Sequence, residues 1–166
     1  MIYKYKATIP GSKVFLREYE IKGETTLYSL HDFLLNDLGF APDQMVVFRG
    51  LDDKERVKRE YGLFDMGDGT MDTVTLVKTL SRGETNLLYV FDLHNDRFIK
   101  LAFVEEVEPA FRASYPRLVA EKGRNPEQFA KGYDDFDQFT DPVDDGGDDS
   151  TFMEEELPEG TGENIL

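Results

Sequence analysis

The chain has 166 residues, no cysteine and a net charge of −15. This length falls within the usual size of one domain. The absence of cysteine excludes disulfides and thiolate chemistry. No apolar run reaches the roughly 7–15 residues of a signal peptide or the roughly 18 residues of a membrane span. We therefore expect a cytoplasmic protein that makes no membrane contact.

The negative charge is concentrated at the C-terminal end of the chain. Residues 133–166 contain 13 acidic residues and no Lys or Arg, which leaves 21 acidic and 19 basic residues in residues 1–132. A segment so acidic and so poor in apolar side chains cannot offset the entropy lost on ordering. The sequence therefore predicts one folded domain over residues 1–132 and a disordered acidic tail over residues 133–166.

The chain begins with a predicted β-hairpin. Apolar and polar residues alternate over residues 2–9 and again over residues 14–21. This period of two is typical of strands with one exposed face. Residues 10–13 (Pro-Gly-Ser-Lys) have turn chemistry, because proline sets φ and glycine tolerates positive φ. The two segments are therefore expected to pair with each other.

The clearest helix signal follows at residues 27–38. Hydroxyl groups in residues 23–26 supply an N-cap, and Gly39 is the expected C-terminal residue in the left-handed conformation. One apolar stripe runs along the segment, made by Leu27, Leu30, Leu34 and Leu38. Because Leu34 lies in the middle of this stripe, we predict that it lies in the core beneath a sheet.

The middle of the chain has weaker patterns. Residues 45–48 form a short apolar run with β-branched valines, which predicts a strand. Residues 51–60 are highly charged, which favours a loop or a solvated helical turn. Residues 73–80 fit either a strand or a short helix on their pattern alone.

A second hairpin is predicted from residues 86–92 and 97–107. Both faces of the second segment carry apolar groups, which is typical of a central strand. Residues 114–119 are expected to be extended, because a residue before proline avoids the helical region. Residues 125–129 have the order of N-cap, proline and acid that starts a short helix. We therefore predict an α+β fold: a mostly antiparallel sheet with an N-terminal hairpin and one principal helix packed on it.

Three local patterns occur together in a recognisable order. They are Leu30-His31 after a Thr-Thr-Leu helix start, Leu88–Asp92 after a Gly-Glu pair, and Tyr115–Arg117 before Asn125–Glu127. In this order and spacing the chain resembles, over roughly residues 1–132, the Ri-plasmid open-reading-frame-three-like family. Its members are also labelled resolvase-like TnpR passengers of insertion elements. The resemblance implies an α+β fold with a mostly antiparallel sheet against a helix, and it brings no catalytic residue.

The densest polar cluster before the tail is one loop, made by Asp92, His94, Asn95, Asp96 and Arg97. Carboxylate and imidazole groups in one loop are typical of a polar-ligand site, with His31 as a possible second imidazole. The other interpretation is a hairpin turn, for which Asn and Asp are the usual residues. With two histidines and no cysteine, we predict no metal and no cofactor.

The acidic tail contains aromatic residues, among them Tyr133, Phe136 and Phe139. A binding segment would use them as anchors while its carboxylates steer it to a basic protein surface. A solubilising tail is the other interpretation. Either way, the charge repels nucleic acid.

We therefore expect a non-enzymatic protein-interaction module of the type associated with mobile elements. The alternative is a small ligand-binding or hydrolytic domain centred on the Asp92–Arg97 loop with His31. No nucleophile–base spacing or phosphate loop in the sequence supports that alternative.

Overall fold

The computed structural model describes residues 1–129, so the prediction of a disordered tail over residues 133–166 lies outside the described residues. These residues form one seven-stranded sheet in the order β4-β3-β5-β6-β1-β2-β7. Every neighbouring pair is antiparallel. The strands are β1 Ile2–Thr8, β2 Leu16–Lys22, β3 Val47–Leu51, β4 Val57–Tyr61, β5 Asn86–Asp92, β6 Arg97–Val107 and β7 Arg117–Lys122. The helices are α1 Leu27–Leu38 and α2 Leu76–Ser81.

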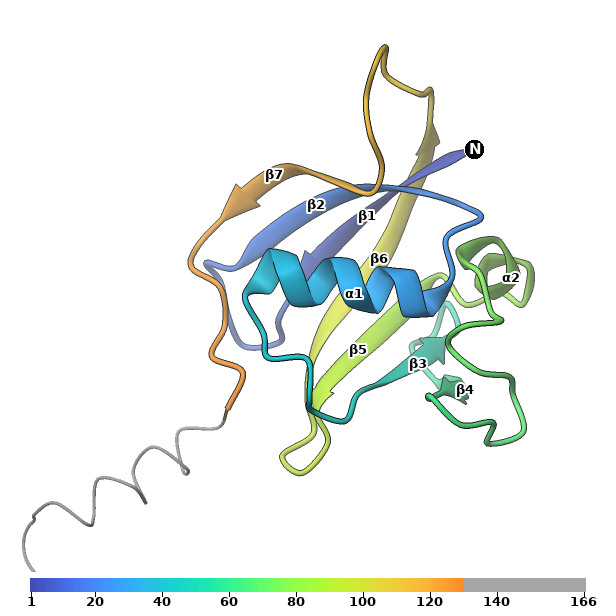
Figure 1. The fold of residues 1–166 in the computed structure, drawn as a ribbon, viewed down its shortest axis with the longest axis vertical. Helices are drawn as coiled ribbons and strands as arrows, with labels where there is room; N and C mark the ends of the chain where they lie inside the picture. The colour runs from blue at the N-terminus through green and yellow to red at the C-terminus, as the bar shows by residue number, and fades with distance from the viewer. Residues whose placement is uncertain (130–166) are drawn as a thin grey trace, which may run out of the picture. The chain divides into compact units, whose positions relative to one another are not determined.

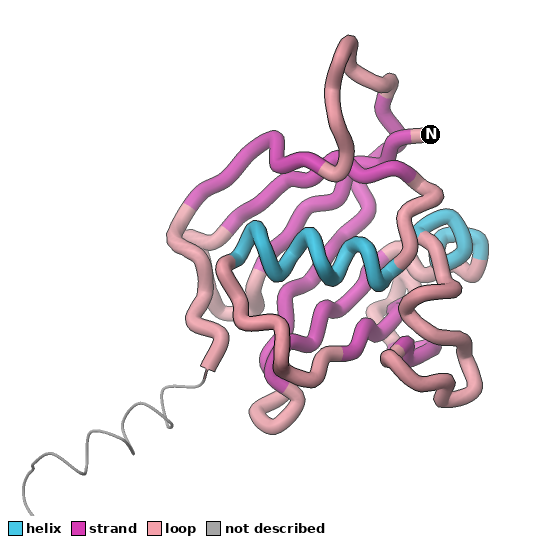
Figure 2. Tube along the Cα trace, viewed as in Figure 1, coloured by secondary structure: helices cyan, strands magenta, loops and turns pink. Residues whose placement is uncertain are grey.

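Helix α1 lies across one face of the sheet (Figures 1 and 2). Its N-cap is Thr26, whose hydroxyl accepts a hydrogen bond from the backbone N–H of Ser29 at 3.1 Å. Gly39 ends the helix at φ 71°, a conformation that glycine adopts without the steric cost of a Cβ. The predicted helix, with both of its end signals, is confirmed. Within residues 1–129, neither helix is long and apolar enough to cross a membrane.

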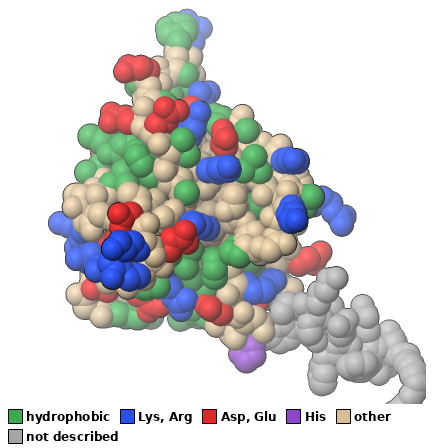
Figure 3. All heavy atoms as spheres, turned by 180° about the vertical axis from the view of Figure 1, so that it is seen from behind, with side chains coloured by type: hydrophobic (Ala, Val, Ile, Leu, Met, Phe, Trp, Pro, Cys, Tyr) green, Lys and Arg blue, Asp and Glu red, His purple; other side chains and the backbone are tan. Residues whose placement is uncertain are grey.

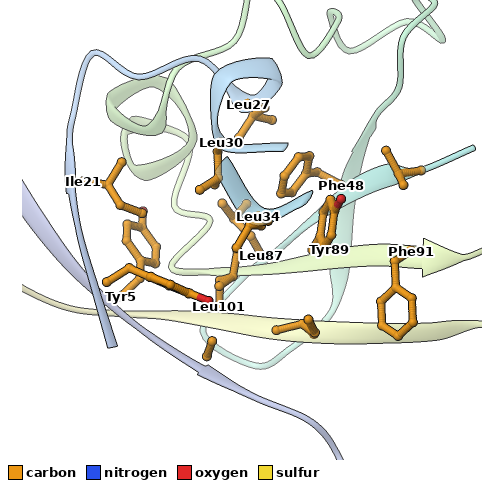
Figure 4. Close-up of a cluster of buried hydrophobic side chains, with 14 of the residues drawn as sticks. Tyr5, Ile21, Leu27, Leu30, Leu34, Phe48, Leu87, Tyr89, Phe91 and Leu101 are labelled. Carbon is orange, nitrogen blue, oxygen red and sulfur yellow. The ribbon is translucent and has the colours of Figure 1, made fainter. Parts of the chain in front are cut away.

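The main core lies between α1 and the sheet (Figure 4). The side chain of Leu34 has no exposed surface, and it packs with the side chains of the sheet beneath it. The predicted core position of Leu34 is therefore confirmed. The cluster draws on both hairpins, for example through Tyr5, Leu87 and Leu101.

Strands β5 and β6 form the second hairpin with the predicted bounds. Strand β6 is the fourth of the seven strands, which confirms its predicted central position. A smaller apolar cluster lies among β3, β5 and β6, made by Val47, Leu51, Leu88 and Val90 with Phe98 packed against them. These residues alternate with residues of the main core, so they point to the opposite face. That face also carries charges of both signs (Figure 3).

The structure differs from the predictions in two segments. Residues 51–60 were expected to form a loop or a solvated helical turn, but Val57–Tyr61 is strand β4. As an edge strand, β4 leaves Lys58 exposed and Arg59 and Glu60 half-buried. Tyr61, in contrast, is fully buried. Residues 125–129 contain no helix. The ambiguous pattern over residues 73–80 becomes helix α2, with Thr75 as its N-cap.

The segment of residues 123–128, here called the strap, forms no helix because side chains from distant elements bind it. The guanidinium of Arg17 is 2% exposed and donates to the carbonyl oxygens of Lys122 (2.7 Å) and Gly123 (2.9 Å). It also donates to Oδ1 of Asn125 at 2.8 Å. These charge-assisted bonds replace the local bonds that a helix would form. The helix-start signal at Asn125 is therefore overridden by tertiary contacts.

The far end of the strap is held by an amide pair. The side-chain amide of Gln128 accepts from the backbone N–H of Ala41 (2.7 Å) and donates to the carbonyl oxygen of Ala41 (3.0 Å). Arg97 donates to the carbonyl oxygen of Gln128 at 3.0 Å. The strap thus links β7 to the segment after α1 and to the loop between β5 and β6.

Replacing Arg17 with lysine is expected to loosen the strap without unfolding the sheet. One ammonium group cannot reach all the acceptors that the planar guanidinium binds. We expect a loss of about 1–3 kcal/mol in the free energy of unfolding, because the buried cation loses charge-assisted hydrogen bonds. Hydrogen exchange in residues 123–128 should become faster. The exposed Arg124→Lys variant is the control, and unchanged exchange in Arg17→Lys would contradict this account.

Candidate functional site

The loop between β5 and β6 uses its polar side chains within the turn. The carboxylate of Asp92 accepts from the backbone N–H and the side-chain amide of Asn95, at 3.2 and 3.0 Å. It also lies 3.3 Å from Nε of Arg97. Asp96 has φ 53° and accepts from Arg49 of β3 at 2.9 Å. This geometry is that of a turn with an Asx-type cap.

The two histidines lie in different environments. His31 is buried on α1, and its Nδ1 is 2.8 Å from the hydroxyl oxygen of Tyr89 on β5. Burial lowers the pKa of His31 below its ordinary value of 6.5, which favours the neutral imidazole. His94 is exposed in the β5–β6 loop. The structure therefore brings Asp92, Asn95 and Arg97 together, while the polar contact of His31 within the described residues is with Tyr89.

His31 makes the stability of the fold depend on pH in a defined direction. Because its folded-state pKa lies below 6.5, the unfolded chain binds this proton more readily than the folded chain does. The contribution is fully present above about pH 6.5 and is lost as pH falls below that value. We expect His31→Gln to flatten this part of the profile, measured by urea denaturation between pH 5 and pH 8. The control His94→Gln should follow the wild type, and equal slopes for all three proteins would contradict the assignment.

An ionic network around one buried carboxylate joins β4 to the connection between α2 and β5, and no sequence pattern predicted it. The side chain of Glu84 is fully buried. Its carboxylate accepts from the hydroxyl of Tyr61 at 2.7 Å and from Nη1 of Arg59 at 2.7 Å. Arg82 in turn donates to the hydroxyl oxygen of Tyr61 at 2.9 Å. Both carboxylate oxygens are therefore engaged, and the network holds the edge strand in place.

An exposed apolar cluster lies beside the first turn of α1. This cluster, here called the aromatic patch, consists of Tyr28, Leu63, Phe64 and Met66, which are 42%, 46%, 77% and 51% exposed. Tyr28 comes from α1, and the other residues come from the connection between β4 and α2. The two segments are joined by a hydrogen bond from the backbone N–H of Tyr28 to the carbonyl oxygen of Met71, at 2.9 Å. The patch is therefore a feature of the folded structure.

A pocket of about 180 Å³ opens within the patch, lined by Tyr28, Leu63 and Asp72. The carboxylate of Asp72 is exposed at this site and contacts the hydroxyl of Thr70. Asp65, also exposed, accepts from the backbone N–H of Gly67 at 2.8 Å. The pocket thus combines apolar walls with the carboxylate of Asp72, which suits an apolar side chain that lies next to a cation.

Sequence patterns identified neither the patch nor the pocket. The signal was present in Leu63-Phe64-Asp65-Met66, where large apolar residues stand in a segment of turn chemistry. Residues 1–129 contain no group of three or more His, Asp or Glu side chains placed to hold a metal ion. The predicted tail anchors Tyr133, Phe136 and Phe139 lie outside the described residues.

The fold is a mostly antiparallel seven-stranded sheet with few helices, and the comparisons identify its family. The chain matches the family described as plasmid pRiA4b ORF-3-like protein over residues 2–158. It therefore belongs to this family, as the resemblance predicted. The match continues past residue 132 and includes most of the acidic segment, which the resemblance had placed outside the family pattern.

A solved structure has a similar fold. The crystal structure of MM3350 from Methanosarcina mazei Go1, a protein of unknown function, superposes with a TM-score of 0.64 at 15% sequence identity. The similarity covers 85% of this chain and 82% of that one. At this identity the similarity shows the shared fold alone. The curated proteins contain no significant match.

Proposed function

We propose that the protein is a protein-interaction module and that its partner binds the aromatic patch. The observation that carries this proposal is the exposure of four large apolar side chains, two of which, Tyr28 and Leu63, line a pocket. Contiguous apolar surface of this kind, rimmed by polar groups, is typical of protein–protein interaction sites. Aromatic and methionine side chains are also enriched at interface centres.

The geometry of the predicted ligand loop gives less support to a ligand-binding or hydrolytic domain. Asp92 is engaged by Asn95 and Arg97, and Asp96 is engaged by Arg49. The imidazole of His31 is buried and bonded to Tyr89. A hydrolytic site needs a base within reach of an accessible nucleophile or water. We therefore favour the interaction module.

The partner that fits the patch is a basic protein surface with an apolar anchor. Asp65 and Asp72 are exposed near the apolar side chains. Residues 133–166 add 13 carboxylates to the same chain. Acidic groups increase the association rate with a basic partner, and a buried apolar anchor supplies most of the short-range binding energy.

The test is affinity capture with the full-length chain as bait. It compares the wild type with a patch variant, Leu63→Ser/Phe64→Ser. The control is Val14→Ser, which changes a valine of similar exposure (63%) in the turn between β1 and β2. A partner captured by the wild type and the control should be lost by the patch variant. Calorimetry with the purified partner should then show direct, salt-sensitive binding. Equal capture by the patch variant and the control would overturn the proposal.

For the acidic segment, we propose a steering role in the same interaction. The family match includes Tyr133, Phe136 and Phe139, so these residues belong to the family pattern. A chain truncated after Lys131 should bind the captured partner more slowly at low salt, with a smaller change in dissociation rate. Surface plasmon resonance at two salt concentrations separates the two rates. The variant Phe136→Ala/Phe139→Ala keeps the charge unchanged and should instead increase the dissociation rate. If this variant and the truncated chain both bind with wild-type rates, the acidic segment has no role in the interaction.

A further inference from the structure

The same chain exposes an apolar ring next to a cation, which are the two groups that suit the pocket. Residues 108–116 connect β6 to β7 and are here called the arm. The arm projects beyond the sheet (Figure 1). Phe111 in the arm is 89% exposed, the highest value among the exposed large apolar side chains of the described residues. The guanidinium of Arg112 lies 5.1 Å from the centre of the Phe111 ring. An apolar ring and a cation are therefore presented side by side.

Hydrogen bonds within the arm hold it in shape. The backbone N–H of Ala110 donates to the hydroxyl oxygen of Tyr115 at 2.8 Å. The backbone N–H of Ala113 donates to the carbonyl oxygen of Ala110 at 3.2 Å. Arg112 has φ 57°, a conformation that is uncommon for a residue with a side chain and often marks functional loops. An arm ordered before binding loses less conformational entropy when it docks.

We propose that Phe111 of one copy enters the pocket of a second copy, where Arg112 pairs with Asp72. This inference rests on the proposed function, and it names one occupant of the pocket: the arm of a second copy, whose apolar ring and neighbouring cation are the local chemistry that the pocket suits. The pocket of about 180 Å³ is large enough for a phenyl ring, since a cavity of about 150 Å³ holds benzene. The walls formed by Tyr28 and Leu63 match the ring, and Asp72 matches the cation.

The contact joins two different surfaces, so it is heterologous. At 89% exposure, Phe111 fills no pocket formed by residues 1–129 of its own chain. The pocket lies between the first turn of α1 and the connection that follows β4, whereas the arm follows β6. Contacts between unlike surfaces produce rings or open chains of subunits. Because one arm covers a small area, we expect association that is reversible and depends on concentration.

The test is sedimentation velocity of the full-length chain over a concentration series. The wild type should form species larger than the monomer as concentration rises. Phe111→Ala should weaken this association by more than about tenfold, as loss of a central aromatic anchor usually does. Arg112→Asp and Asp72→Arg should each weaken it, and the double variant Arg112→Asp/Asp72→Arg should recover it because the pair is restored with reversed signs. The control Lys13→Asp makes the same charge change as Arg112→Asp at an exposed site in the turn between β1 and β2.

Three results would overturn the inference: a wild type that stays monomeric throughout, a Phe111→Ala variant that associates like the wild type, or a double variant that does not recover. Thermal unfolding shows whether the Asp72 variants fold, and Phe111→Ala keeps the test valid if they do not. If the wild type is monomeric while Leu63→Ser/Phe64→Ser loses a captured basic protein, the proposed function stands and self-association fails. If the wild type is monomeric and Leu63→Ser/Phe64→Ser still captures every partner of the wild type, both the proposed function and self-association fail.

Discussion

Replacing Gly50 with alanine is expected to destabilise the fold by about 3–5 kcal/mol, the range seen when a buried charge is left without its partner. Gly50 lies on β3 against the carboxylate of Glu84. A Cβ at this position would lie 2.2 Å from Oε1 and 2.5 Å from Cδ of Glu84. These distances are too short for non-bonded atoms, so the carboxylate has to move. It would then lose its hydrogen bonds to Tyr61 and Arg59 inside the protein.

Chemical denaturation of Gly50→Ala and of a matched glycine variant measures this effect. Gly62→Ala is the control, because its Cβ would meet the terminal methyl of Met66 at 3.1 Å, and that exposed side chain can move. A double-mutant cycle with Glu84→Ala isolates the clash. Gly50→Ala/Glu84→Ala should lose less stability than the two single variants added together. A Gly50→Ala protein as stable as the wild type would contradict this account, because it would show that the Glu84 side chain can adopt another conformation at no cost.

Replacing Leu34 with alanine is expected to cost about 2–5 kcal/mol in the free energy of unfolding. Its side chain is fully buried between α1 and the sheet. Alanine removes apolar contacts and leaves a cavity that the rigid sheet below cannot close. Urea denaturation measures the loss. Leu63→Ala removes the same atoms from a side chain that is 46% exposed, and it should change stability by less than about 0.5 kcal/mol. Similar losses for both variants would contradict the assigned position of the helix stripe.

Some of the fold was readable from the sequence because the signals are local. The stripe of leucines, the Thr26 cap and Gly39 lie within one segment, and together they specify helix α1 without help from distant residues. The hairpin of β5 and β6 follows from two largely apolar segments on either side of a polar turn. The turn formed by Asp92 and Asn95 was also readable from the sequence, because its hydrogen bond joins residues only three positions apart.

Other features required the tertiary structure because they depend on residues far apart in the chain. Strand β4 exists because its charged sequence pairs with β3 at an edge of the sheet and buries Tyr61. The strap forms no helix because Arg17, more than a hundred residues earlier, binds Asn125.

The candidate sites divide in the same way. Local sequence indicated polar loops and an acidic tail, because composition alone shows where charge accumulates. The aromatic patch appeared only once α1 and the connection after β4 were placed side by side, with Tyr28 bonded to Met71. The neutral state of His31 likewise depends on its burial against Tyr89. Periodicity specified which residues face inward, whereas long-range packing decided which surfaces meet and which apolar side chains stay exposed to a partner.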